Sequence, residues 1–389
     1  MEGHHRRAVG QRGRTLTGRG GVVATRCARP LRWFRRPIHP SVSSVPVHRR
    51  RPRCLHHARR GRLPPMRPII VRLPNWIGDV VMALPALQRL DAQGWRPVLV
   101  GKGWAGSLLS GHAWPVHRHP AGVRERVRML RRIARDAGAR HDAPPHLDCL
   151  LLTNSFSSAL EARLAGLRAL GHASDARGWL LARAVTPTAG AHEIDRFDAL
   201  SRQVGAAPGV SPDIAAAQAT AGPQTAAPRP VLRVSEDAQR EAERLLVAAG
   251  IDRRFACIVP FATGTLGGVP KAWPGFDAFA PRLAARLPVV VLPGPGEDAA
   301  ARERFASAVP LAGVGLDAYA AILSRAAVVV ANDTGPGHVA AAVGAPLVSV
   351  LGPTDASRHG ARGAHVHLLQ GDPWPSVDAV ESATRRWID

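Results

Sequence analysis

The segment from residue 327 to residue 351 constrains the fold more than any other part of this sequence. A run of apolar and small residues, Ala327 to Ala331, leads into a polar corner from Asn332 to Gly337. Small residues from His338 to Val343 and a second apolar run from Pro346 to Leu351 follow. This is the pattern of a buried strand, a turn, a helix and another strand. In parallel α/β sheets, ligands bind beyond the carboxyl ends of strands, where helix N-termini offer free backbone amides. The sequence therefore predicts an anion site at this turn.

The same alternation of apolar runs and helical segments begins at residue 66 and predicts parallel sheets covered by helices. Residues 207–230 interrupt it with mostly Ala, Pro, Gly, Thr and Gln, which is the composition of a linker. Two doubly wound halves joined by a linker predict a central cleft, and active sites favour such interfaces. We expect strands over 69–73, 97–100, 147–153, 255–259 and 288–292, and helices over 79–92, 123–137, 192–204, 235–249, 276–287, 298–308 and 316–325.

Most of the formal net charge of +23 lies in the first 65 residues, which contain 17 Arg and six His against one acidic residue. The remaining chain has 35 basic and 28 acidic residues and is only mildly basic. The overall charge therefore does not predict a nucleic-acid-binding protein, and we expect no nucleic-acid partner for residues 66–389. Residues 1–65 are interpreted as a disordered basic extension, as sequence upstream of a true start at Met66, or as a polyanion-binding arm.

Four cysteines are present, without a CxxC motif or Cys/His ligand spacing, so the sequence predicts neither a zinc site nor a disulfide framework. A reducing, cytoplasmic compartment fits this composition. No apolar run approaches the roughly 18 to 20 residues that a membrane-spanning helix needs.

Two polar segments that follow predicted strands carry candidate catalytic and phosphate-binding groups. Asp79 comes after the first strand, where it would either cap the next helix or act as a general base toward a sugar hydroxyl. Lys271 comes after the strand at 255–259, behind Thr263 and Gly264 in a loop of small and hydroxyl residues. These small residues allow an oxyanion to approach the backbone, and Lys271 can neutralise it. The alternative is a solvated surface lysine.

Two further segments carry candidate sugar-binding groups. Glu297 follows the strand at 288–292, where it would accept hydrogen bonds from ribose hydroxyls or stand as an ordinary first-turn helix residue. In the turn after Ala331, Asp333 is a candidate for binding sugar hydroxyls. His338 and the backbone amides of Thr334 and Gly335 are candidates for binding phosphate. Helix capping by Asp333 and core packing by His338 are the alternatives.

One motif competes with this interpretation. The glycines of residues 101–106 satisfy GxGxxG after a predicted strand, and Glu125 follows about twenty residues on, as in dinucleotide-binding folds. The motif follows the second strand rather than the first, which weakens that hypothesis. No Asp-x-Asp pair is present to hold a metal against a diphosphate, so Lys271 and helix ends are left to neutralise its charge.

These pieces resemble the ADP-heptose:lipopolysaccharide heptosyltransferases of glycosyltransferase family 9, from about Arg67 to the C-terminus. The resemblance rests on Trp76-Ile77-Gly78-Asp79 with Ala83 to Leu87, on Lys271-Ala272-Trp273-Pro274, on Asp333-Thr334-Gly335 with His338, and on Gly352-Pro353-Thr354-Asp355. The heptosyltransferase II branch in particular is similar in Asn154 to Leu160, in Gly171 and in Arg177 to Leu181.

The resemblance implies an α/β protein of GT-B fold, with two doubly wound Rossmann-like domains that face a central cleft. The acceptor domain would be 66–206, followed by the linker at 207–230 and the donor domain at 231–389. Transfer of heptose from ADP-heptose would be inverting and would need no metal or cofactor. The partner would be a lipid-anchored core oligosaccharide, met by a cytoplasmic protein at the inner face of the inner membrane.

The resemblance also assigns roles to residues. Asp79 matches the proposed base and Lys271 the donor-phosphate lysine. Glu297 matches the ribose-binding glutamate. The loop of Asp333, Thr334, Gly335 and His338 matches the donor-sugar and phosphate loop. Thr263 and Gly264 are added as donor-binding residues, although the loop around them is longer than usual for the family. The acceptor-binding candidates are Asn154, Ser155, Arg131 and Arg135, with a solvated face as the alternative for the two arginines. A transferase of the same fold that uses another nucleotide sugar is the alternative function.

Overall fold

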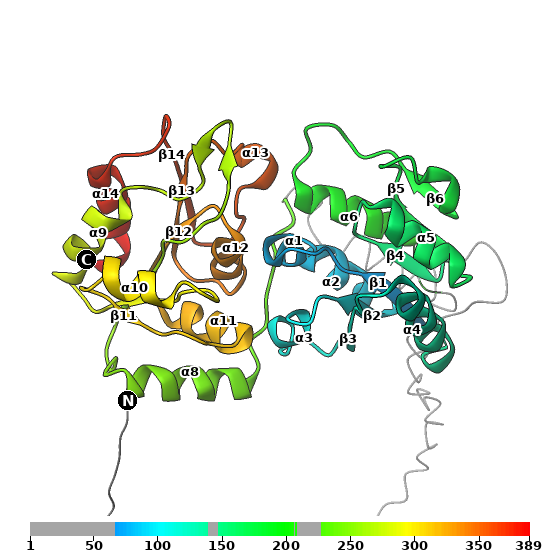
Figure 1. The fold of residues 1–389 in the computed structure, drawn as a ribbon, viewed down its shortest axis with the longest axis horizontal. Coiled ribbons are helices and arrows are strands. Elements are labelled where there is room, and N and C mark those ends of the chain that lie inside the picture. The colour runs from blue at the N-terminus through cyan, green and yellow to red at the C-terminus, as the bar shows by residue number, and fades with distance from the viewer. Residues whose placement is uncertain (1–66, 139–146, 206, 208–226) are drawn as a thin grey trace, which may run out of the picture. The chain divides into compact units, whose positions relative to one another are not determined.

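The computed structural model describes residues 67–138, 147–205, 207 and 227–389, all of which belong to one compact unit, Arg62–Asp389. The basic N-terminal segment and most of the predicted linker lie outside the described residues. Two six-stranded parallel sheets with flanking helices form the unit (Figure 1). The first sheet has the order β3-β2-β1-β4-β5-β6 and the second has the order β11-β10-β7-β12-β13-β14. Both orders reverse direction beside the first strand of the half, which is the doubly wound arrangement that the sequence predicts.

The strands of the two sheets are short, and their bounds are as follows. The first sheet contains β1 (Arg67–Arg72), β2 (Trp95–Gly101), β3 (Val116–Arg118), β4 (Cys149–Leu151), β5 (Ala169–His172) and β6 (Arg183–Val185). The second contains β7 (Ala256–Val259), β10 (Val289–Val291), β11 (Val309–Pro310), β12 (Val328–Asn332), β13 (Leu347–Leu351) and β14 (Val366–Gln370). An antiparallel hairpin, β8 (Thr265–Leu266) and β9 (Val269–Pro270), stands apart from both.

Helices fill most of the connections between these strands. The first half contains α1 (Ile77–Met82), α2 (Leu84–Ala92), α3 (Ala105–Leu108), α4 (Val123–Asp136), α5 (Phe156–Leu164), a 3₁₀ turn (Gly178–Leu180) and α6 (Glu193–Val204). The second contains α8 (Glu236–Ala248), α9 (Phe276–Ala284), α10 (Asp298–Arg304), α11 (Leu316–Arg325), α12 (Gly335–Ala342), α13 (Ala356–His359) and α14 (Val377–Ile388).

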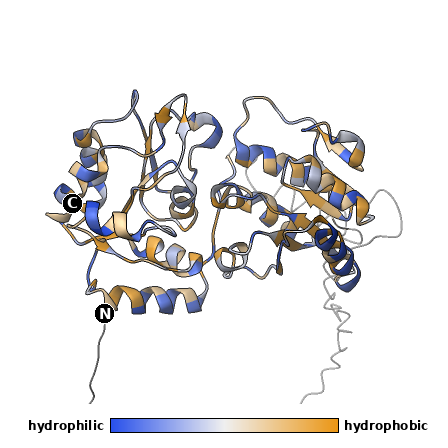
Figure 2. Ribbon diagram, in the orientation of Figure 1, coloured by the Kyte–Doolittle hydropathy of each residue, from blue (hydrophilic) through white to orange (hydrophobic). Residues whose placement is uncertain are grey.

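The hydrophobic core follows the two-residue alternation of the strands. In β1, Ile69 and Val71 point to a core shared with α1, α2, α3 and α6, whereas Ile70 points to a separate core shared with α4 and α5. The first of these cores continues without a break into residues of α8, α11 and α12. A third core lies on the other face of the second sheet, against α9 and α14. Only one side of α4 is buried in these cores, and Figure 2 shows that the helix is otherwise hydrophilic.

Several predicted helices have different bounds from those expected: α9 and α10 end at Ala284 and Arg304, before the predicted positions 287 and 308, and two helices differ more substantially. The helix predicted over 79–92 is divided at Ala83 into α1 and α2, because Pro85 lies in the first turn of α2 and a proline cannot continue a preceding helix. The helix predicted to begin at His338 begins at Gly335, with Pro336 in its first turn, where the missing proline N–H costs nothing. The polar corner is therefore shorter than predicted, and its last residues already belong to a helix N-terminus.

Several elements were not predicted. The outer strands β3, β6, β11 and β14 are short or half-exposed, so they lack the apolar run that marks the central strands. The helices α5 and α14 have Ser155 and Ser376 as their N-cap residues, a residue type that marks helix starts and that the predictions did not use. Within the described ranges, no helix has both the length and the apolar character needed to cross a bilayer.

A buried amide at the end of β12 holds the loop that carries Lys271. The Asn332 side chain is fully buried, accepts a hydrogen bond from the Trp273 backbone N–H at 2.8 Å and donates one to the Pro260 carbonyl at 2.7 Å. These bonds tie both ends of the hairpin segment to the carboxyl end of a central strand. Asn332 therefore fixes the position from which Lys271 extends.

We predict that Asn332→Ala lowers the free energy of unfolding by roughly 2 to 5 kcal/mol, since it leaves a buried donor and a buried acceptor unpaired. Chemical denaturation monitored by circular dichroism measures the loss. Asn154→Ala is the matched control, because the buried Asn154 Oδ1 has no hydrogen-bond partner among the described residues. Equal losses in the two variants would contradict the role assigned to Asn332.

Candidate active site

A cavity of about 580 Å³ lies beyond the carboxyl ends of β7, β10 and β12. Most of its wall is apolar, and three of the predicted donor-binding residues, Thr263, Glu297 and Thr334, contribute polar groups to it. Ile77 and Trp104 reach the same cavity from the first half of the chain. The larger apolar side chains of the wall are Val259, Phe261, Leu292, Val314, Leu316 and Tyr319. An apolar cavity with a few polar groups suits a flat, partly polar ligand such as a nucleoside.

The Lys271 segment is a short hairpin rather than an irregular loop. The strands β8 and β9 are joined through Gly267 and Gly268, whose φ angles of 59° and 82° require glycine-like freedom. The Lys271 backbone N–H donates to the Gly264 carbonyl at 3.1 Å, which closes the base of the hairpin. Lys271 is half-buried and does not line the cavity, so its contact with a donor phosphate stays a prediction.

Glu297 lies immediately before α10 and folds back over its own loop. Its Oε2 accepts a hydrogen bond from the Gly294 backbone N–H at 2.7 Å. This bond holds the carboxylate at the edge of the cavity and leaves Oε1 for a ligand hydroxyl. The position agrees with the predicted ribose contact, which stays a prediction.

The corner between β12 and α12 brings the remaining donor candidates together. The N-cap of α12 is Thr334, and no side chain caps this helix, so the capping alternative for Asp333 is not what the structure has. Burial raises the pKa of Asp333, while His359, a hydrogen bond with Thr354 and Lys271 act to lower it. The backbone amides at the start of α12 are therefore open to an anion.

His338 is buried in the first turns of α12, and its Nε2 lies 3.9 Å from Oδ1 of Asp333. Burial, together with the nearby His192 and His359, lowers the pKa of His338 to about 4. The imidazole is therefore neutral near pH 7. Any contact of His338 with a phosphate would be a hydrogen bond from a neutral ring rather than an ion pair.

Asp79 lies in the first turn of α1, after the N-cap residue Trp76, so it does not cap the helix. Burial, with a smaller contribution from Glu193, raises its pKa to about 6, and His359 acts in the opposite direction. A carboxylate with this pKa is mostly ionised at pH 7 and still basic enough to accept a proton. These properties suit a general base.

The N-termini of α1 and α12 touch at two glycines. A Cβ atom on Gly335 would lie 3.0 Å from Ile77 Cβ and 3.2 Å from the Gly78 nitrogen. A Cβ on Gly78 would lie 3.1 Å from His338 Cδ2. Side chains at either position would separate the two helices. The contact therefore brings Gly78, the chain neighbour of Asp79, against the N-terminal turn of α12.

The acceptor candidates are divided by the structure. Ser155 lines a polar cavity of the first half, and Asn154 precedes it in the chain. Arg131 instead donates from Nη2 to the Leu164 carbonyl at 2.7 Å, and Arg135 pairs with its neighbour Asp136 on the exposed face of α4. The two arginines do not line that cavity.

One histidine near the site was not singled out from the sequence. His359, at the end of α13, acts electrostatically on Asp79, Asp333 and His338. Its position could not be predicted, because it lies more than twenty residues from each of them in the chain. The competing glycine motif at residues 101–106 runs into a short helix: α3 begins within it and spans only four residues, Ala105–Leu108.

A family model of glycosyltransferase family 9 (heptosyltransferase) matches residues 148–384. The ADP-heptose LPS heptosyltransferase II of E. coli has a similar structure, with a TM-score of 0.65 and 23% identity over 83% of this chain and 98% of that chain. A family 9 glycosyltransferase from Veillonella parvula has a TM-score of 0.65 and 17% identity, over 83% and 97%. The E. coli heptosyltransferase WaaC with ADP has a TM-score of 0.60 and 22% identity, over 82% and 99%. A search of curated protein sequences returned no match.

Two doubly wound parallel sheets, which are also the architecture of the similar heptosyltransferase structures, give this chain the GT-B fold. The family match, which extends over more than half of the sequence, identifies it further. The chain belongs to glycosyltransferase family 9, the heptosyltransferase family.

We predict that Gly335→Ala lowers the free energy of unfolding by roughly 1 to 3 kcal/mol, because the added methyl group overpacks the contact with α1. Thermal unfolding followed by calorimetry measures the change, and initial rates of transfer measure its effect on activity, which should also fall. Gly106→Ala is the control, since a Cβ there meets nothing within 4 Å. Unchanged stability and activity of Gly335→Ala would show that the two helices are not held at this distance.

Proposed function

We propose that this protein transfers a heptose from ADP-heptose to an inner-core acceptor of lipopolysaccharide, with inversion at the anomeric carbon and without a metal ion. The observation that supports this most is the contact between the N-termini of α1 and α12. This contact joins the helix that carries Asp79, whose pKa burial raises to about 6, to a helix whose N-terminal amides would suit a diphosphate. A base on one side and an anion site on the other are the two groups that a displacement of diphosphate needs.

In the proposed reaction, the Asp79 carboxylate accepts the proton of an acceptor hydroxyl. The hydroxyl oxygen forms a bond to the anomeric carbon of the heptose, while the bond from that carbon to the diphosphate oxygen breaks. A single displacement from the opposite face inverts the anomeric configuration. ADP leaves with the additional negative charge, and stabilising this charge lowers the barrier.

The donor would occupy the cavity of the second half. Its apolar wall suits the adenine base, and Oε1 of Glu297 suits a ribose hydroxyl. Lys271 and the amides of Thr334 and Gly335 would neutralise the diphosphate. Thr263 and Gly264 would contact the donor from the base of the hairpin. Asp333 would accept hydrogen bonds from the heptose hydroxyls. His338 would donate a hydrogen bond from a neutral ring.

The charge-neutralising groups of this proposal all belong to the chain, which is why no metal ion is included in it. The acceptor would be a lipid-anchored core oligosaccharide, approached from the cytoplasmic face of the inner membrane. Asn154 and Ser155 lie in the half of the chain assigned to the acceptor. Unchanged turnover after treatment with a chelator is the expected result for the metal-free reaction.

We predict that Asp79→Asn lowers kcat by about 10²- to 10⁴-fold, the usual contribution of a general base. The affinity for ADP should not change. For the wild-type protein, kcat should fall as the pH drops through about 6, because protonated Asp79 cannot accept a proton. Initial rates between pH 5 and 8 test both points.

Asp91→Asn is the matched control for Asp79→Asn. Burial also raises the pKa of Asp91, but its carboxylate accepts a hydrogen bond from Trp114 Nε1 at 2.8 Å, away from the proposed site. Its kcat and acid limb should match those of the wild type. A wild-type rate in Asp79→Asn would remove Asp79 from the mechanism.

We predict that Lys271→Met weakens ADP binding by roughly tenfold or more, the effect of losing one charge-assisted hydrogen bond to phosphate. Isothermal titration calorimetry with ADP, GDP and UDP measures this loss and the nucleotide preference together. Lys102→Met is a suitable control, because Lys102 is the only other lysine of the chain and lines a different cavity, whereas Lys271 acts electrostatically on Asp333. Tighter binding of GDP or UDP than of ADP would replace the proposed donor by another nucleotide sugar.

A further inference from the structure

Tyr319 is the only tyrosine of the chain, and it lines the cavity in which the donor is proposed to bind. Only 7% of the residue is exposed. Its hydroxyl oxygen is buried and has no hydrogen-bond partner among the described residues. A buried hydroxyl that stays unpaired costs free energy, and each such group in a folded protein needs an explanation. A ligand in the cavity can supply the missing partner.

The helix that carries Tyr319 is fixed at its start. The Tyr319 backbone N–H donates to the Gly315 carbonyl at 2.7 Å. Two residues earlier, the Asp317 backbone N–H donates to Ser107 Oγ of α3 at 3.2 Å, which ties α11 to the first half of the chain. Trp104, the N-cap residue of α3, lines the same cavity. The Tyr319 ring therefore stands in a wall that α3 and α11 build together.

The protonation state of the hydroxyl is set by its surroundings. Burial raises the pKa of Tyr319 well above its usual value, and Cys257 and Glu297 act in the same direction. The hydroxyl therefore keeps its proton near neutral pH and can donate as well as accept a hydrogen bond. Cys257 belongs to the core at β7, whereas Glu297 lines the cavity. The hydroxyl thus lies within electrostatic reach of the carboxylate that is proposed to hold the ribose.

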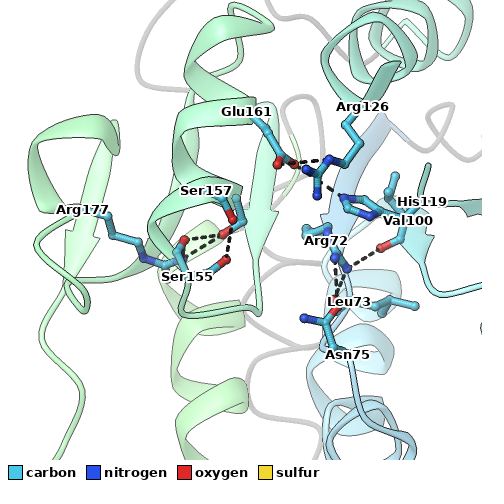
Figure 3. Close-up of polar contacts among 11 residues, drawn as sticks. Arg72, Leu73, Asn75, Val100, His119, Arg126, Ser155, Ser157, Glu161 and Arg177 are labelled. Atoms are coloured by element: carbon cyan, nitrogen blue, oxygen red, sulfur yellow. Dashed lines mark hydrogen bonds and ion pairs between the residues drawn. The ribbon is translucent and has the colours of Figure 1, made fainter. Parts of the chain in front are cut away.

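Unpaired polar atoms also occur in the first half of the chain, around a cationic cavity of about 660 Å³. This cavity lies beyond the carboxyl ends of β1, β2 and β3, and its charged wall residues include Arg72, Lys102, Arg118, Arg126 and Glu161. Figure 3 shows Arg126 and His119 beside Glu161, whose Oε1 lies 3.3 Å from Arg126 Nε and whose Oε2 lies 3.5 Å from His119 Nε2. Charged neighbours compensate these groups. Of the residues that line the donor cavity, Tyr319 alone has a buried side-chain nitrogen or oxygen without a partner in the described chain.

The part of the ligand that would meet Tyr319 follows from the rest of the wall. Leu316, one helical turn before Tyr319, lines the cavity together with Leu292 and Val314. Apolar side chains suit the faces of a flat aromatic base, but they cannot read the polar atoms at its edge. A tyrosine hydroxyl can, because it places one polar atom at the end of an apolar ring. In a nucleotide the base is bonded to the ribose, so a ribose held by Glu297 would place its base in this part of the cavity.

We propose that the Tyr319 hydroxyl forms a hydrogen bond with the nucleobase of the donor and selects the base that the cavity accepts. The hydroxyl donates to a ring nitrogen of the base, and the cost of its burial is offset only when a nucleotide is bound. A base without an acceptor at this position would leave the hydroxyl unpaired, and the cavity would discriminate against it. This inference rests on the proposed function for the presence of a nucleotide, and it adds the side chain that recognises the base.

The test removes the hydroxyl alone, as Tyr319→Phe in the full chain. Isothermal titration calorimetry measures the affinity for ADP, for adenosine and for pyrophosphate. Binding of ADP and of adenosine should weaken roughly three- to tenfold, the effect of losing one neutral hydrogen bond. Pyrophosphate has no base and should bind both proteins equally. Without ligand, the midpoint of thermal unfolding of the variant should equal or exceed that of the wild type, because the hydroxyl that is removed has no partner to lose.

Ser349→Ala is the matched control. Ser349 Oγ is buried in β13 and also has no partner among the described residues, but Ser349 does not line the donor cavity. Its removal should likewise not lower the midpoint of thermal unfolding. The affinities for all three probes should stay at their wild-type values, because this hydroxyl cannot reach the ligand.

A second readout follows from the single tyrosine of the chain, since isotope labelling at tyrosine Cζ gives one NMR resonance. This resonance should shift on saturation with ADP or adenosine and stay in place with pyrophosphate. Equal affinity of the wild type and Tyr319→Phe for ADP, or a lower thermal midpoint of the ligand-free variant, would overturn the proposal alone. Failure of ADP, GDP and UDP to bind the wild type would overturn it together with the proposed function. If GDP or UDP binds best, the same comparison is made with that diphosphate and its nucleoside.

Discussion

The direction of the strands decides where chemistry can take place in this protein. Every strand of each six-stranded sheet runs parallel to its neighbours, so all strands of one sheet deliver their following loops to the same edge. The hydrophobic core occupies the sheet faces, and the polar residues that follow β1, β7, β10 and β12 have only this edge to occupy. Both cavities are found there, each beside the position where the strand order reverses. The topology of the sheets therefore sets where the site lies, and the particular side chains set its chemistry.

Glycine has a specific role in joining the two halves. At Gly78 and Gly335 the absence of a side chain lets the start of α1 approach the start of α12. The proposed base and the proposed diphosphate site then come from different sheets, and their separation depends on backbone contact rather than on long side chains. A flexible side chain in that contact would allow a range of distances. Two glycines in direct contact restrict the two helices to a narrow range of distances.

The central part of the fold could be predicted from the sequence, because buried parallel strands are continuous apolar runs. The outer strands could not, since β3 and β14 are half-exposed and carry polar residues. Local rules also competed with each other. The Gly335-Pro336-Gly337 sequence suggests a turn, yet it forms the first turn of α12, where proline is tolerated and the following residues are small.

The candidate donor residues were accessible to sequence reasoning because each one follows a recognisable strand, and Thr263, Glu297 and Thr334 indeed line one cavity. Their functional roles remain predictions. The cationic cavity was not accessible in this way. Arg72 lies inside a strand and Glu161 inside a helix, 89 positions apart, and only the folded chain shows that they enclose the same space. Arg131 and Arg135 were chosen from the arginine-rich helix, but helical geometry turns Arg126 inward and those two outward.

The two lysines of this arginine-rich chain are divided between the two halves. Lys102 lines the cationic cavity, and Lys271 stands at the base of the hairpin beside the donor cavity. Amine-directed acylating reagents react with lysine and spare the guanidinium groups that dominate the rest of the surface. Each half of the chain therefore contains one lysine that such a reagent can modify. A label on one of these lysines would report ligand binding close to it, because the arginines of the chain would carry almost no label.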